Sequence, residues 1–115
     1  MKREFLDYME DIIEAINSVI KFTEGMEYEE FIKDDKTTSA IIRKLEIIGE
    51  AVKRISEEVK ISYPQIPWKD IAGMRDKLIH EYFGVDLKRV WKTAKEEIPE
   101  LKPLFKRILK DFQEK

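Results

Sequence analysis

Hydrophobic residues recur along the chain at intervals of three and four positions, which is the spacing of one face of an α-helix. The two clearest series are Phe5, Met9, Ile12, Ile16 and Val19, and Ile41, Leu45, Ile48, Val52, Ile55 and Val59. No segment shows the strict alternation of a half-buried strand, and the sequence has no internal repeat. The chain is therefore predicted to be all-α, a bundle of four to five helices.

Residues that favour helix ends divide the N-terminal half. Gly25 suits the end of the first helix, and residues 28–33 suit a short helical turn. Asp34 and Asp35 offer an N-cap for the second long helix. This helix is expected to end near Lys60, because the prolines that follow it break a helix.

The C-terminal half is predicted to hold three more helices. The first begins near Trp68, after a proline that suits a first helical position, and Gly84 ends or bends it. Asp86 can cap the next helix. Pro99 and Pro103 are expected to interrupt that helix, so the last helix begins after the second proline.

Gly49 lies inside the hydrophobic series of the second long helix, where it costs about 1 kcal/mol against alanine. We expect a packing reason, namely the close approach of a neighbouring helix. A second series on the same helix consists of Arg43, Ile47, Glu50 and Arg54. An isoleucine between charged residues predicts a second contact surface, for another helix or for another subunit.

The composition narrows the class of protein. With 115 residues, 43% hydrophobic and 40% charged, the chain is expected to be one globular domain over residues 1–115. It has no cysteine, which excludes disulfides and thiolate chemistry and fits a cytoplasmic location. No apolar run is long enough for a membrane span.

Residues 1–35 carry 4 basic and 11 acidic side chains, and the remainder is mildly basic. Nucleic-acid contact is permitted, but ordinary solvated helix faces explain the same pattern.

The segment of residues 74–82 is the strongest candidate for chemistry. It contains His80, the only histidine, with Arg75 five residues before it and Tyr82 two residues after it. Histidine titrates near neutral pH and arginine binds phosphate, so the pair suits acid–base chemistry at a phosphate. No cofactor is expected, and one histidine with scattered carboxylates does not make a zinc site. The sequence also lacks a glycine-rich phosphate loop and a well-placed nucleophile.

A helical projection of this segment separates its candidate residues. Asp76 and His80 are one turn apart on one face, so the carboxylate could orient the imidazole. Arg75 lies about 140° away from His80 around the helix. Two chains around a two-fold axis would bring both groups to one cleft, which favours a homodimer. The simpler interpretations are a surface histidine, an Arg75 paired with Asp76 or Glu81, and a Tyr82 that packs in the core.

The motif Arg75-x4-His80-x-Tyr82 resembles the signature of HepT-like proteins of the HEPN superfamily. The surroundings agree in three further places: residues 47–51 (IIGEA), residues 66–75 (IPWKDIAGMR) and residues 80–86 (HEYFGVD), with Trp91 also in its usual position. The resemblance covers nearly the whole chain.

This resemblance implies a helical bundle that dimerises through the motif region. It implies a metal-independent endoribonuclease, the toxin of a type VII toxin–antitoxin system, with RNA as substrate. Arg75 and His80 match the catalytic residues, and Asp76 matches a supporting polar position. Tyr82 matches the tyrosine that the antitoxin, an MntA-type nucleotidyltransferase, modifies with AMP. The alternative is a non-catalytic module that binds nucleotide or docks onto a nucleotidyltransferase subunit.

Overall fold

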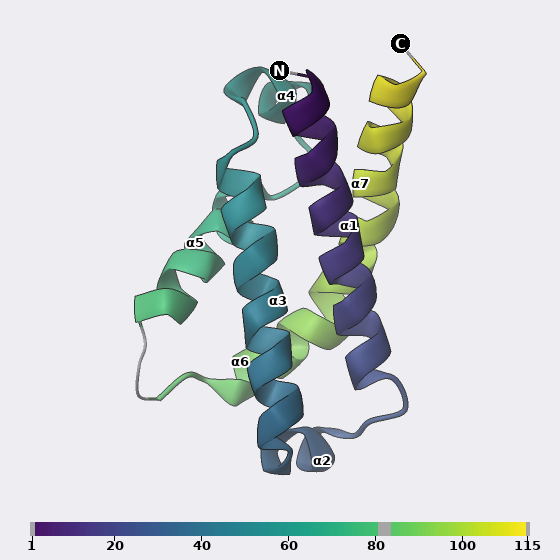
Figure 1. Ribbon diagram of the computed structural model, residues 1–115. Coiled ribbons are helices and arrows are strands. Elements are labelled where there is room, and N and C mark those ends of the chain that lie inside the picture. The colour runs from purple at the N-terminus through teal and green to yellow at the C-terminus, as the bar shows by residue number, and fades with distance from the viewer. Residues whose placement is uncertain (1, 81–83, 115) are drawn as a thin grey trace.

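The computed structural model describes residues 2–80 and 84–114, and this part of the chain is helical without any strand (Figure 1). The predicted all-α class is thereby confirmed. The elements in chain order are α1 (Lys2–Thr23), α2 (Tyr28–Lys33), α3 (Asp35–Lys53), α4 (Glu57–Ser62), α5 (Trp68–His80), α6 (Leu87–Lys92), the π-helical turn η1 (Thr93–Glu97) and α7 (Ile98–Gln113).

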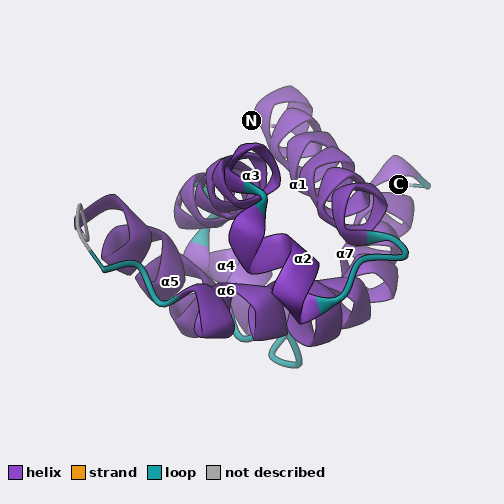
Figure 2. Ribbon diagram, turned by 90° about the horizontal axis from the view of Figure 1, so that it is seen from below, coloured by secondary structure: helices purple, strands orange, loops and turns teal. Residues whose placement is uncertain are grey.

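Helix α1 forms the centre of the bundle, because it packs against α3 on one side and α7 on the other. Helix α5 packs against α3 at the outer edge, away from α1 (Figure 2), and Trp68 at its start packs against Phe105 of α7 with the ring centroids 5.7 Å apart. Fully buried side chains fill the space between the long helices: Met9, Ile12, Ile16 and Val19 of α1, Ile41, Leu45, Ile48 and Val52 of α3, and Phe105 and Ile108 of α7. Within the described residues, no helix is long and apolar enough to cross a membrane.

Three of the predicted helix starts are confirmed. The Asp34 carboxylate accepts a hydrogen bond from the backbone N–H of Thr37 at 3.0 Å and caps α3. Helix α5 begins at Trp68. The Asp86 side chain caps α6 by accepting from two backbone N–H groups.

The predicted end of the second long helix near Lys60 is wrong. Helix α3 ends at Lys53, and a separate helix, α4, begins after Ser56. Ser56 has an extended backbone, and its hydroxyl accepts a hydrogen bond from the N–H of Val59 at 3.4 Å. Since Ile55 is buried and Val59 half-buried, the hydrophobic series continues across the break and hides it.

The predicted interruption at the two prolines is also wrong. Helix α6, the π-helical turn and α7 follow one another without a gap, with Pro99 in the first turn of α7 and Pro103 inside it. Because α7 continues the helix from η1, Pro99 removes a backbone hydrogen-bond donor just as Pro103 does. Pro103 is exposed, and the opposite face of α7 is anchored by the buried Ile98, Leu101 and Phe105. Burial of that face outweighs the hydrogen bond that Pro103 removes.

Candidate active site

Arg75 projects from α5 onto α3 at the position of Gly49. A Cβ atom added to Gly49 would overlap the Cβ of Arg75, and would lie 2.9 Å from its Cγ and 3.1 Å from the backbone oxygen of Ile71. The expected close approach of a helix at Gly49 is therefore confirmed, and the helix that approaches is α5, which packs against α3 together with α1 and α2. The Arg75 side chain lies in the resulting crevice and is 25% exposed.

Asp76 of α5 binds two cationic side chains, of which Lys53 comes from α3 and Arg75 from α5 itself. Lys53 Nζ donates a hydrogen bond to Asp76 Oδ1 at 2.8 Å, and Arg75 Nη1 donates to the same oxygen at 3.1 Å. The hydrogen bond from Lys53, and then that from Arg75, lowers the pKa of the Asp76 carboxyl below its usual value of 3.8. The carboxylate is therefore ionised at neutral pH and holds two positive charges beside it.

Lys53 lies outside the motif, and the motif gives no indication of it. It lies 23 residues from Asp76 in sequence. A signal existed, since Lys53 follows Gly49 by one helical turn and therefore shares the face of α3 that meets α5. This spacing points to Lys53 only once the helix that packs against Gly49 is known to be α5.

His80 is the last residue of α5, and its side chain is exposed. The Asp76 carboxylate was expected to orient it, yet the hydrogen bonds of Asp76 within the described residues go to Lys53 and Arg75. Arg75 faces α3, so a single chain does not bring Arg75 and His80 together through any hydrogen bond between described residues. Tyr82, the expected modification site, lies outside the described residues.

Arg75 has a donor that the rest of the described chain leaves unused. Its Nε atom is buried and has no hydrogen-bond partner among these residues. An unsatisfied buried donor costs about 1–3 kcal/mol. Buried polar groups are otherwise almost always paired, with protein or with ordered water, so a water molecule or a ligand would satisfy this donor.

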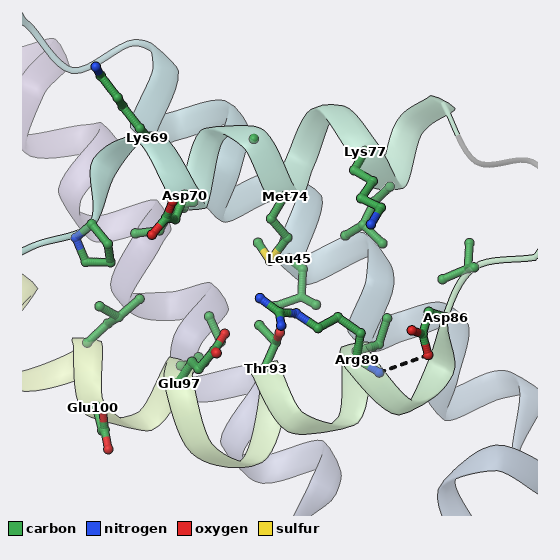
Figure 3. Close-up of a pocket in the computed structure, with 18 of the residues that line it drawn as sticks. Leu45, Lys69, Asp70, Met74, Lys77, Asp86, Arg89, Thr93, Glu97 and Glu100 are labelled. Carbon is green, nitrogen blue, oxygen red and sulfur yellow. Dashed lines mark hydrogen bonds between the residues drawn. The ribbon is translucent and has the colours of Figure 1, made fainter.

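A groove of about 830 Å³ lies on another face of α5, between this helix and the run from α6 to α7 (Figure 3). Met74 and Lys77 line it from α5, and Arg89, Thr93 and Glu97 line it from the opposite wall. The guanidinium of Arg89 extends along the groove toward Thr93 (Figure 3). About half of the residues that line the groove are apolar, and seven of the twenty are charged. No group of three metal-ligating side chains occurs within residues 2–80 and 84–114.

The helical bundle and the arginine and histidine of α5 thus define a small all-α protein with a candidate phosphate-directed site. The family model described as Ribonuclease HepT-like matches residues 12–108, so the chain belongs to the HepT-like ribonuclease family. This confirms the family that the motif indicated.

Curated relatives extend along almost the full chain. A protein of Methanocaldococcus jannaschii named "Putative RNase MJ1216" is 53% identical over 99% of this chain and 94% of its own length. A protein of Thermococcus cleftensis named "Probable ribonuclease HepT" is 54% identical over 96% of this chain and 100% of its own length. No solved structure gives a significant match.

Proposed function

We propose that this protein is a metal-independent endoribonuclease with Arg75 and His80 as its catalytic residues. The observation that carries the proposal is membership of the HepT-like ribonuclease family along residues 12–108. The site supports it in two ways. The Arg75 side chain is 25% exposed in its crevice, and His80 is open to an incoming substrate.

The reaction uses the nucleophile that RNA itself supplies. His80 takes the proton of a ribose 2′-hydroxyl as a general base, and the 2′-oxygen attacks the neighbouring phosphorus. The bond from phosphorus to the 5′-oxygen breaks, and a protonated imidazole returns a proton to that leaving oxygen. Arg75 holds the phosphate and stabilises the charge that develops on its oxygens. The products are a 2′,3′-cyclic phosphate and a 5′-hydroxyl.

The protein acts as a homodimer in this proposal. Arg75 faces α3 while the His80 imidazole is exposed at the end of α5, so one chain supplies the two groups on different sides of the same helix. A two-fold axis beside α5 lets the histidine of one copy act at a phosphate that the arginine of the other copy binds. Where both copies face one cleft on the axis, one histidine can act as the base and the other as the acid.

The proposed biological role is that of a type VII toxin whose antitoxin is an MntA-type nucleotidyltransferase. The antitoxin adds AMP to Tyr82, two residues after His80. The adenylyl group places bulk and negative charge beside the cleft, which repels the phosphates of RNA. Intact mass of protein made with and without the nucleotidyltransferase tests this step, with Tyr82→Phe as the variant that should no longer gain the mass of AMP and Tyr28→Phe as its control.

Cleavage of RNA in the presence of a chelator tests the ribonuclease function. Arg75→Ala and His80→Ala are expected to lose activity by about 10²–10⁴-fold, the usual contribution of one acid–base or charge-stabilising group. Arg107→Ala is the matched control, because Arg107 is 75% exposed on α7 and forms an ion pair with Asp111, away from Arg75 and His80 in sequence. Equal activity of all four proteins would exclude the proposed roles.

The groove between α5 and α6 favours one alternative, a non-catalytic module that binds a nucleotide. Its volume of about 830 Å³ suits a mononucleotide. In that case calorimetry should detect binding of AMP, and Arg89→Ala should weaken it, whereas Lys88→Ala, on an exposed neighbour outside the groove, should not. Nucleotide binding without any RNA cleavage would favour this function over the first.

A further inference from the structure

We propose that Lys53 is a second phosphate-binding residue of the active site, acting beside Arg75. The inference rests on the ribonuclease function proposed above. Lys53 stands outside the Arg-x4-His-x-Tyr motif, on a different helix. Its ammonium group and the Arg75 guanidinium both donate to a single oxygen, Asp76 Oδ1, so the two cationic groups converge on one point.

The charge at this point is the main argument. Arg75 and its neighbour Asp76 form an ion pair of zero net charge, which by itself offers little attraction to a phosphate. Lys53 raises the sum to one positive charge. A phosphodiester carries one negative charge, so the three side chains and one phosphate together are neutral. Without Lys53 the same complex would carry an excess negative charge.

The donors of both cations are only partly used. The Lys53 ammonium has three N–H donors, and one of them binds Asp76. The Lys53 and Asp76 side chains are 43% and 47% exposed, so a ligand can reach them. The Asp76 carboxylate holds the two cationic groups beside each other, and a phosphate would bind to the donors that Asp76 leaves unused.

Stability alone gives little reason for this arrangement. An exposed ion pair between a lysine and a carboxylate contributes at most about 1 kcal/mol, and often nothing measurable. The arrangement also depends on Gly49, whose missing side chain lets α5 approach α3 closely enough for Lys53 to reach Asp76. The same close approach that places Arg75 against Gly49 therefore also brings Lys53 to Asp76 beside Arg75.

The test is binding of a fluorescein-labelled single-stranded oligoribonucleotide at several salt concentrations, in a His80→Ala background that prevents cleavage. Each phosphate contact of a single strand contributes about 0.7 to the slope of log K against log salt. Lys53→Gln should therefore lower the slope by about 0.7 and weaken binding about fivefold at low salt, the factor for one exposed charge contact. Lys106→Gln, on an exposed lysine of α7, should change neither.

A second variant separates a phosphate contact from a merely structural effect. Asp76→Asn breaks the same ion pair as Lys53→Gln, so a structural role would move RNA binding in the same direction in both. The proposal expects opposite directions, because Asp76→Asn removes a negative charge and should tighten binding. An unchanged slope in Lys53→Gln, or weaker binding in both variants, would overturn it.

The outcomes for the two proposals are distinguishable. RNA binding with the expected slopes, but no cleavage by the unaltered protein, keeps the role of Lys53 in phosphate binding and rejects the ribonuclease. Cleavage with equal slopes keeps the ribonuclease and rejects the role of Lys53. Neither binding nor cleavage rejects both.

Discussion

Replacement of Gly49 by alanine tests how tightly α3 and α5 are packed. Alanine is the better helix former, so helix propensity alone predicts that Gly49→Ala stabilises the protein by about 1 kcal/mol. The structure predicts the opposite sign. The new methyl group would overlap the Cβ of Arg75 and lie 2.9 Å from its Cγ and 3.1 Å from the backbone oxygen of Ile71.

The magnitude follows from what can move. The clash involves the base of a side chain and a backbone atom, so rotation of a flexible side chain cannot relieve it. The two helices must separate, and overpacking of this kind costs about 1–3 kcal/mol. We take the upper end, about 3 kcal/mol, and subtract the propensity gain of about 1 kcal/mol. The net loss is about 2 kcal/mol, or a fall in Tm of about 8 °C for a chain of this length.

Urea denaturation and thermal unfolding of Gly49→Ala measure this effect, and Gly73→Ala is the matched control. Gly73 is an exposed residue inside α5, where an added Cβ meets no atom within 4 Å. It should gain the full helix propensity, about 1 kcal/mol and about 4 °C. A Gly49→Ala variant as stable as the unaltered protein, or a shift of both variants in the same direction, would show that α3 and α5 are not tightly packed at Gly49.

Three further predictions concern hydrogen bonds and titration. Tyr63→Phe should lose about 1 kcal/mol in urea denaturation, since it removes the 2.7 Å hydrogen bond from the phenol to Asp111. Burial, and then that hydrogen bond, raises the pKa of Tyr63 in the folded protein above its usual value of 10.0. The protonated phenol therefore contributes its full stability below pH 10.0, and this stability is lost as the pH rises through the folded-state pKa. Tyr63→Phe should lack this loss of stability at alkaline pH. Asp86→Ala should cost about 1 kcal/mol of thermal stability, because it removes the N-cap of α6. NMR titration should show that the lowered pKa of Asp76 rises toward 3.8 in Lys53→Met. In the unaltered protein, the contribution of Asp76 to stability should be lost only as the pH falls below 3.8.

The helix ends that sequence alone predicted correctly are those with a local chemical cause. Asp34 and Asp86 cap helices through their own carboxylates, and Trp68 follows a proline that fits a first helical turn. The prediction failed at Ser56, where the hydrophobic series continues through the break. It failed again at Pro103, where tertiary burial of the opposite face keeps the helix intact. Both failures come from non-local packing, which periodicity does not report.

In the candidate site, too, the features with a local cause were predicted and those that depend on non-local packing were not. A projection of one helix correctly separates Arg75 from His80, because angular position depends only on sequence spacing. It does not determine which way the Asp76 carboxylate turns. The Asp76 carboxylate can accept from the two cationic groups or from the His80 imidazole. It accepts from Lys53 and Arg75, whose charge-assisted hydrogen bonds are stronger than a hydrogen bond from a neutral imidazole. One of those cations comes from α3, so it could be found only with the register between α3 and α5.

That register makes Gly49 a part of the site although it carries no functional group. The contact of Gly49 with Arg75 fixes the distance between the helices, and the same distance allows the 2.8 Å hydrogen bond from Lys53 to Asp76. A methyl group at Gly49 should therefore push α5 away from α3 and so increase the distance between Arg75 and Lys53. RNA binding should then weaken more in Gly49→Ala than in Lys53→Gln. If Gly49→Ala unfolds at a lower temperature but binds RNA as the unaltered protein does, then the spacing of the helices serves stability alone, and the two cations do not act as a unit.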